Sequence, residues 1–249
     1  MYRESGAFKI PCTLPGADSA WAIAIAASGC HGASKIVGQP TLGNRDAANV
    51  HVVSSDALLR WQEERCGVLD SLEAIHEQVT GKRRGRQTAT EHLNLALFLR
   101  LAAEFQGFCR DLHDDAATCI ADSLSDEYAA RIPVILGALV RGRQLDKGNA
   151  SPGKIGTDFG NLGMSLWPAV YSKYPVKGPR WNQVLERLNE VRNAVAHSDN
   201  AKLAEVKRAQ PLTLATFRSW RGSLNTAATG LDKVVGAYLE YLTGGSAWE

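Results

Sequence analysis

The chain has 249 residues, a formal net charge of +2 and 22% charged residues, which is typical of a globular protein large enough to bury a core. This charge gives no sign of a strongly basic nucleic-acid-binding chain, although a small site needs only local positive charge. The five cysteines are odd in number and scattered, which argues against a secreted disulfide framework and favours reduced thiols in a cytoplasmic protein.

Residues 1–54 are rich in Gly, Ala and Ser and have little periodicity, so they are predicted to form an irregular N-terminal extension. A short apolar run at residues 20–27 precedes Cys30 and weakly matches a lipoprotein signal. Prolines and an acidic residue separate this run from the basic residues, so we do not expect export. The Cys and His residues of this segment fit no compact zinc spacing, and neither metal nor cofactor is predicted.

Residues 55–249 form the second predicted domain, and helical periodicity begins at Asp56, near a plausible cap. The apolar positions of its first helix are Leu58, Trp61, Val68, Leu69, Leu72, Ile75 and Val79. A basic loop follows, in which four side chains are candidate contacts to RNA phosphates: Lys82, Arg83, Arg84 and Arg86. The alternative for this loop is an ordinary solvated turn.

A long second helix is predicted from Leu93 to Cys119, with Glu104 at the edge of its apolar face. A third helix is expected to start or kink around Pro133. Residues 148–154 then match most of a phosphate-binding P-loop. Ile155 stands where that loop requires Ser or Thr, and no buried strand precedes the match, so nucleotide hydrolysis is not expected.

A further helix is predicted over residues 181–198, after a short helix and a Pro/Gly-rich break. Its apolar face is expected to be buried and contains Val184, Leu188, Val191 and Val195. The opposite, polar face contains Asn182, Glu186, Asn189, Asn193 and His197. Asn193 and His197 lie one turn apart, whereas Arg192 and His197 point roughly 140° apart in an ideal helix. The long Arg stem or a frayed last turn is needed to bring the two charged groups together.

An Arg followed by a His at similar spacing also occurs at Arg45/His51 and Arg86/His92. The first pair lies in a Gly/Asn/Asp-rich region and the second spans a loop and a helix start. Only Arg192/His197 lies on a well-formed amphipathic helix, and we select it on that basis.

The last helix follows Pro211, and its apolar three-four spacing continues to Leu242, which is typical of the seam of a helical bundle. Arg221 interrupts this seam and is expected either to extend to solvent or to meet a carboxylate. It is a further candidate RNA contact. The predicted fold class is therefore all-α, an antiparallel helical bundle with an irregular N-terminal extension.

The order of the helices, the Leu-Ala-Ala-Glu-Phe segment at residues 101–105 and the Arg-Asn-Ala-Val-Ala-His segment at residues 192–197 resemble the HEPN superfamily, in particular its RiboL-PSP-HEPN type. The resemblance covers roughly residues 56–243. It implies a metal-independent endoribonuclease whose site forms where two domains dimerise, with Arg192 and His197 as catalytic residues and Asn193 as their polar companion. Ser198-Asp199 replaces the small residue, such as Gly, that follows the His in many members.

The chemistry of these residue types supports the same function, because RNA cleavage through its 2′-OH needs proton exchange near neutral pH and a cation for the growing phosphate charge. The alternative is structural: His197 stabilises a helix C-terminus and Arg192 makes a salt bridge. Two functions therefore remain: an endoribonuclease of the toxin or phage-defence class, or a catalytically inactive helical module that binds RNA or protein. The expected partners are RNA, a second copy of the chain, and an antitoxin or defence-system protein, with no membrane.

Glu104 completes the predicted catalytic set, because a carboxylate at the edge of an apolar face needs a cation once it is buried. We predict Arg192 as that cation, which would hold the Arg in position for a phosphate. Pairing with Arg221, or exposure to solvent, are the alternatives.

Overall fold

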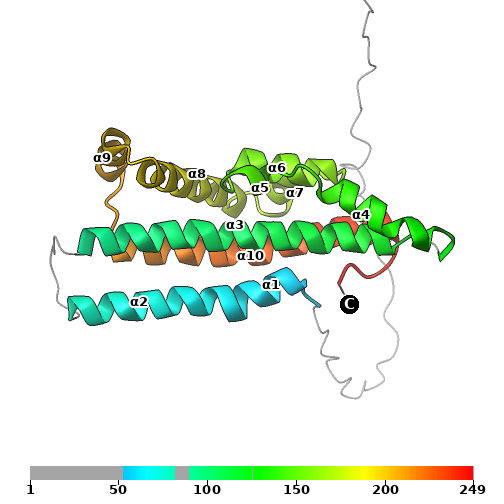
Figure 1. Ribbon diagram of the computed structural model, residues 1–249, viewed down its shortest axis with the longest axis horizontal. Helices are drawn as coiled ribbons and strands as arrows, with labels where there is room; N and C mark the ends of the chain where they lie inside the picture. Colours follow the sequence, from blue (N-terminus) through cyan, green and yellow to red (C-terminus); the bar gives the residue numbers. More distant parts are fainter. Residues whose placement is uncertain (1–52, 82–89, 125, 249) are drawn as a thin grey trace, which may run out of the picture. The chain divides into compact units, whose positions relative to one another are not determined.

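The computed structural model describes residues 53–81, 90–124 and 126–248, and within these ranges the regular structure is helical, with no strand (Figure 1). The predicted all-α bundle is confirmed for these residues. The N-terminal residues 1–52 lie outside them, as do the four predicted basic contacts Lys82, Arg83, Arg84 and Arg86.

The first helical segment consists of α1 (Asp56–Arg60), a π-helical turn (Trp61–Arg65) and α2 (Cys66–Thr80). The Ser55 hydroxyl, and not Asp56, caps its start by accepting the Leu58 N–H at 3.1 Å. Ile75 and Val79, predicted to be core residues, are 50% and 60% exposed. The π turn contains an extra residue, so the buried face does not follow a single helical period through it.

Helix α3 (Glu91–Asp122) is the central element of the fold, and it packs against α1, α2, α4, α8 and α10. Its buried positions include Leu97, Leu101, Phe105, Phe108, Leu112 and Ala116, as the periodicity predicted. Helix α10 (Leu214–Thr243) lies alongside α3, where Phe98 meets Trp220 with ring centroids 5.1 Å apart. The α1–α2 segment and α8 run in the opposite direction to α3 and α10 (Figure 1).

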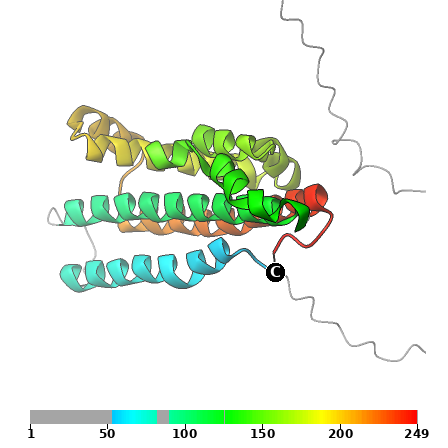
Figure 2. The same cartoon turned by 45° about the vertical axis from the view of Figure 1, so that its right-hand side comes forward.

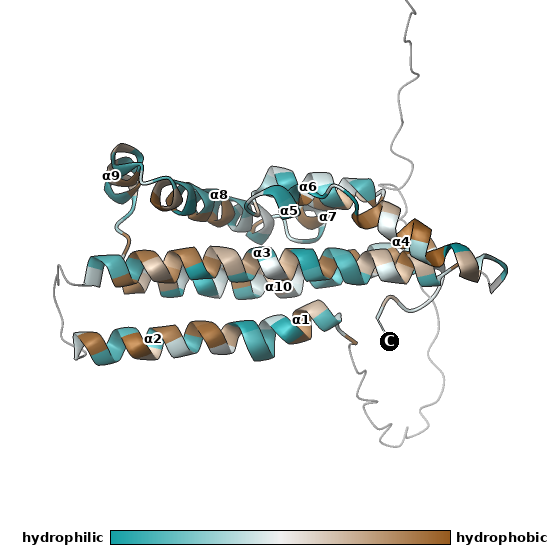
Figure 3. Ribbon diagram, in the orientation of Figure 1, coloured by the Kyte–Doolittle hydropathy of each residue, from teal (hydrophilic) through white to brown (hydrophobic). Residues whose placement is uncertain are grey.

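Four short helices connect α3 to α8: α4 (Ile132–Val140), α5 (Gln144–Lys147), α6 (Pro152–Asn161) and α7 (Leu166–Lys173), seen from a second angle in Figure 2. A 3₁₀ turn (Asp126–Arg131) precedes α4. Helix α4 consists of apolar residues and glycine, yet none of its residues is buried. Figure 3 shows it as a hydrophobic segment next to the end of α3.

Helix α8 (Lys177–Ala196) begins earlier than predicted, because Gly178 and Pro179 lie inside its first turn, where the missing proline N–H breaks no helical hydrogen bond. Its buried face contains Trp181, Leu185, Leu188, Val191 and Ala194. The prediction is therefore wrong for Asn189, which is only 7% exposed, and inexact for Val184 and Val195, which are half-buried. Helix α9 (Asn200–Ala209), polar and short, was not predicted.

None of the helices in the described ranges combines the length and the apolar composition needed to cross a bilayer. The three cysteines in these ranges, Cys66, Cys109 and Cys119, are free thiols.

Candidate active site

The last turns of α8 carry the three residues selected from the sequence. Arg192 is half-buried, whereas Asn193 and His197 are exposed. The Arg192 Nη1 donates to Asn193 Oδ1 at 3.2 Å, so the amide holds the guanidinium along the helix surface. His197 is the C-cap of α8, and its backbone N–H bonds to the Asn193 carbonyl at 3.0 Å. Both predicted catalytic side chains therefore lie at one solvent-facing helix end, with no hydrogen bond between them among the described residues.

The turn after His197 explains why glycine suits the next position. Ser198 has φ 54°, in the left-handed region that glycine adopts at helix ends. The Asp199 N–H closes the turn on the Ala194 carbonyl at 2.8 Å. The Asp199 carboxylate accepts the Lys202 N–H at 2.9 Å and so caps α9. This acidic side chain, close to His197 in sequence, is thus engaged with the N-terminus of α9.

A second element joins this surface, and it comes from the rejected P-loop-like segment. Asn149 Nδ2 donates to Asn193 Oδ1 at 3.3 Å, and Lys154 Nζ donates to Asn149 Oδ1 at 3.2 Å. Two cations, Lys154 and Arg192, are consequently linked through two side-chain amides. Neither Asn149 nor Lys154 was predicted to belong to the site, and the Gly-rich segment ending in Lys was the signal that could have indicated them.

The segment that carries Asn149 is fixed from three directions. Gln106 of α3 donates to the carbonyls of Leu145 and Gly148, each at 2.7 Å. Asn189 of α8 donates to the Ala150 carbonyl at 2.9 Å. This contact explains why Asn189 is buried, although the sequence placed it on the polar, exposed face of the helix. The Trp167 indole donates to the Pro152 carbonyl at 2.6 Å. These hydrogen bonds to its carbonyls fix the backbone of the segment, and the fixed backbone sets the position of the Asn149 side chain.

Glu104 does not join this surface, and the prediction that it pairs with Arg192 is wrong. Its side chain is 7% exposed, so it is buried and needs a cation, as expected. The cations are Arg65, at 2.9 Å, and Arg100, one turn away on α3. Arg65 comes from the π turn, so Glu104 faces the α1–α2 segment. This pairing separates Glu104 from the Arg192 and Asn193 contacts.

Arg221 also has carboxylate partners, and it faces α2. Its guanidinium lies 2.7 Å from Asp70 and 3.3 Å from Glu73, and it donates to the Cys66 carbonyl at 3.3 Å. Of the two outcomes expected for this residue, the pairing with carboxylates is the observed one.

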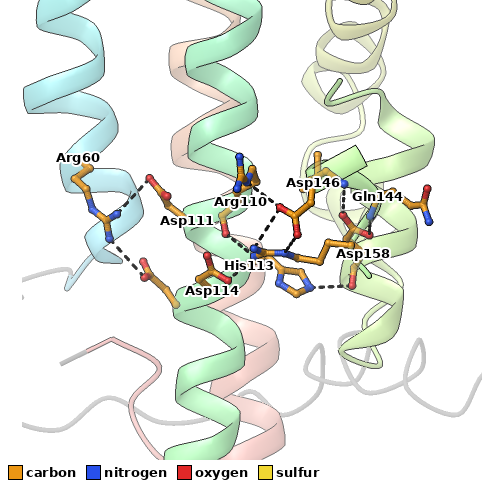
Figure 4. A network of polar contacts seen from close by, with 11 residues as sticks. Arg60, Arg110, Asp111, His113, Asp114, Gln144, Asp146 and Asp158 are labelled. Carbon is orange, nitrogen blue, oxygen red and sulfur yellow. Dashed lines mark hydrogen bonds and ion pairs between the residues drawn. The ribbon is translucent and has the colours of Figure 1, made fainter. Parts of the chain in front are cut away.

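A separate group of charged side chains connects α3 with α1 and α5 (Figure 4). Arg143, 7% exposed, contacts Asp114 and lies 3.1 Å from Asp146, while Arg110 lies 3.1 Å from Asp146. Several of these residues line an open cavity of about 510 Å³: Arg65, Ala103, Gln106, Gly107, Arg110, Asp111 and Asp114. Both cations that line this cavity, Arg65 and Arg110, already have carboxylate partners, so the group mainly connects neighbouring helices through ion pairs.

His113 lies beside this charged group but is fully buried, with an exposed fraction of 0%. Its Nε2 lies 3.1 Å from the Asp158 carbonyl, and Nδ1 has no hydrogen-bond partner (Figure 4). Burial lowers the pKa of this imidazole below its usual value. The Asp158 carboxylate accepts the backbone N–H groups of Gln144 and Leu145 at 2.7 and 2.9 Å. This histidine and this aspartate position α5 and α6 against α3.

Comparison with protein-family models, with curated proteins and with solved structures gives no match. Within the described ranges, no three His, Cys, Asp or Glu side chains gather as metal ligands would. The chemistry available at the end of α8 is that of an imidazole, a guanidinium, an ammonium group and side-chain amides.

Proposed function

We propose that this protein is an endoribonuclease of the HEPN type that cleaves RNA without a metal ion, with Arg192 and His197 as its catalytic residues. One observation carries the proposal: a solvent-facing helix end presents an imidazole together with a guanidinium that is held by Asn193 and has no carboxylate partner among the described residues.

The proposed reaction is transesterification followed by release of a cyclic product. A base removes the proton of the ribose 2′-OH, whose oxygen attacks the adjacent phosphorus. The P–O5′ bond breaks, an acid protonates the departing oxygen, and a 2′,3′-cyclic phosphate remains. His197 serves as a proton-transfer group, because an imidazole changes charge near neutral pH. Arg192 stabilises the negative charge that grows on the phosphate oxygens.

Acid and base catalysis on one phosphate is easier with two imidazoles, and a single copy supplies one at this surface. We therefore propose a homodimer in which two α8 ends meet near a two-fold axis, since an isologous contact repeats the same residues on both sides. The exposure of His197 and Asn193 supports this arrangement, because nothing in the described part of one copy covers them.

The test of this function is incubation of the purified protein with mixed RNAs in the presence of a chelator, beside Arg192→Ala and His197→Ala. We expect the wild type to produce 2′,3′-cyclic phosphate ends and both variants to be inactive. Their melting temperatures should stay close to that of the wild type, because His197 is exposed and, among the described residues, the Arg192 side chain bonds to its neighbour Asn193 alone. Cleavage that needs a metal ion, or that survives both substitutions, contradicts the proposal.

The second candidate is a module that binds a protein partner, such as an antitoxin or a defence-system component, without cutting RNA. The observation that favours it is α4, an apolar helix with no buried residue, in which Val134 is 74% exposed. Intact RNA after long incubation with the wild type would favour this candidate.

A further inference from the structure

The 13 arginines of the described residues divide into seven that have a carboxylate partner there and six that have none. Seven of them lie within ion-pair distance of an Asp or Glu: Arg60, Arg65, Arg100, Arg110, Arg143, Arg218 and Arg221. Arg192 is one of the six, and it differs from the other five because its amide partner Asn193 connects it through Asn149 to a second cation, Lys154.

The two amides bring these cations into one group. Asn193 Oδ1 accepts from Arg192 at 3.2 Å and from Asn149 at 3.3 Å, and Asn149 Oδ1 accepts from Lys154 at 3.2 Å. Amide oxygens orient positive groups without neutralising them, so the positive charge of the pair remains available. Two like charges held in one group repel each other, and a bound anion relieves that repulsion.

Backbone contacts make this group a built feature of the fold. A Cβ at Gly148 would lie 2.3 Å from Lys154 Nζ, so glycine leaves space for the lysine side chain to lie back over the segment. Gln106 and Asn189 hold the Gly148 and Ala150 carbonyls on either side of Asn149. The side chain of Asn149 is therefore presented to Asn193 by a segment that is fixed at both ends.

We propose that Lys154 and Arg192, oriented by Asn149 and Asn193, form a two-cation subsite for the backbone phosphates of single-stranded RNA. The choice of RNA rests on the proposed function, whereas the phosphate chemistry rests on the cation pair itself. A single strand suits an open, solvent-facing surface, because its backbone can follow the cations and its bases can turn away. Lys154 binds substrate next to the reacting phosphate and takes no part in proton transfer.

The test measures binding separately from cleavage, with a fluorescent 2′-O-methyl RNA oligonucleotide that lacks the attacking hydroxyl and cannot be cut through it. Lys154→Met keeps most of the side-chain length and removes the charge. We expect roughly three- to tenfold weaker binding in low salt, and a salt slope reduced by about 0.7, the value for one phosphate contact on a single strand.

The matched control is Lys173→Met, which removes an exposed lysine at the end of α7, where its ammonium group contacts the Lys233 carbonyl at 3.3 Å. Lys173→Met should leave affinity and salt slope unchanged, and Lys154→Arg should keep the salt slope, because the charge remains. Circular dichroism of Lys154→Met should match the wild type.

The outcomes separate the two proposals. Equal losses for Lys154→Met and Lys173→Met, or no binding by the wild type, overturn the subsite. Equal binding of a DNA oligonucleotide of the same sequence overturns the assignment to RNA. If the wild type cuts no RNA but binding shows the expected dependence on Lys154, the catalytic proposal fails and the subsite stands.

Discussion

Arg65 and Glu104 form an ion pair of 2.9 Å that joins the π turn to the middle of α3. The second nitrogen of the same guanidinium lies 2.6 Å from Asp111, about two turns further along α3. This arrangement depends on Gly107, because a Cβ there would lie 2.2 Å from Arg65 Nη1. A buried carboxylate, a bridging arginine and a glycine beneath it thus fix the α1–α2 segment against the central helix.

The first prediction follows from this ion pair: Glu104→Gln should lower the free energy of unfolding and leave RNA cleavage intact. The amide keeps an acceptor for Arg65 but removes the charge that balances Arg65 and Arg100 in a buried position. We expect a loss of about 1–3 kcal/mol, measured by denaturant unfolding.

The control is Glu205→Gln, because Glu205 forms an exposed pair with Lys202 at 3.2 Å. Its effect should stay within about 0.5 kcal/mol. Strong loss of cleavage in folded Glu104→Gln would show that Glu104 acts in catalysis after all.

The partner of Glu104 also shows how far helical periodicity can predict this fold. Periodicity identifies the long helices α3 and α10 and predicts that Glu104 is buried and paired. It does not say which neighbouring helix covers each part of the α3 surface, because that depends on where the helices cross. Of the two cations that meet Glu104, Arg100 lies one turn away on the same helix, whereas Arg65 comes from a π turn, which an apolar pattern does not reveal.

The second prediction concerns the turn after His197, where Ser198 has φ 54°. Ser198→Gly should raise the free energy of unfolding by about 0.5–1 kcal/mol, because glycine adopts this conformation without steric cost. Cleavage should remain, since the backbone path that places His197 is unchanged. Thermal unfolding and the RNA assay measure the two effects.

Ser219→Gly provides the comparison, because Ser219 is exposed within α10. A glycine inside a helix lowers stability by roughly 0.5 kcal/mol, so the two substitutions should have opposite signs. Equal destabilisation by both would mean that Ser198 is not strained.

The third prediction concerns pH and His113. Burial lowers the pKa of its imidazole in the folded protein, whereas the unfolded chain takes up a proton near its ordinary value of 6.5. Below pH 6.5 the unfolded state therefore binds more protons, and the free energy of unfolding falls as pH falls. The slope from one group is at most about 1.4 kcal/mol per pH unit. Above pH 6.5 both states are neutral and this contribution is constant.

His113→Gln should remove this contribution, so the stability difference between wild type and variant should shrink as pH falls from 7 towards 5. His92→Gln is the matched control, because His92 is exposed on the same helix. It should show the wild-type dependence on pH. A His113→Gln protein whose stability follows pH as the wild type does would refute the assignment.

The structure places the three residues selected from the sequence at the end of α8, which local sequence reasoning could predict, whereas it could not predict what surrounds them. Arg192, Asn193 and His197 belong to one short segment, so one helix suffices to bring them together. Lys154 and Asn149 reach the same surface only because Gln106 and Asn189 hold their segment in place. Such side-chain-to-carbonyl contacts between distant segments have no periodic signal in the sequence.

The pairing of α3 with α10 has a consequence for how the protein is made. Phe98 packs against Phe217 and Trp220, which the ribosome adds much later. At usual translation speeds the delay is on the order of ten seconds. During this time the aromatic face of α3 has been synthesised, but α10, which covers it in the folded protein, has not. We expect the nascent chain to recruit chaperones, and we expect fragments that end before Leu214 to aggregate.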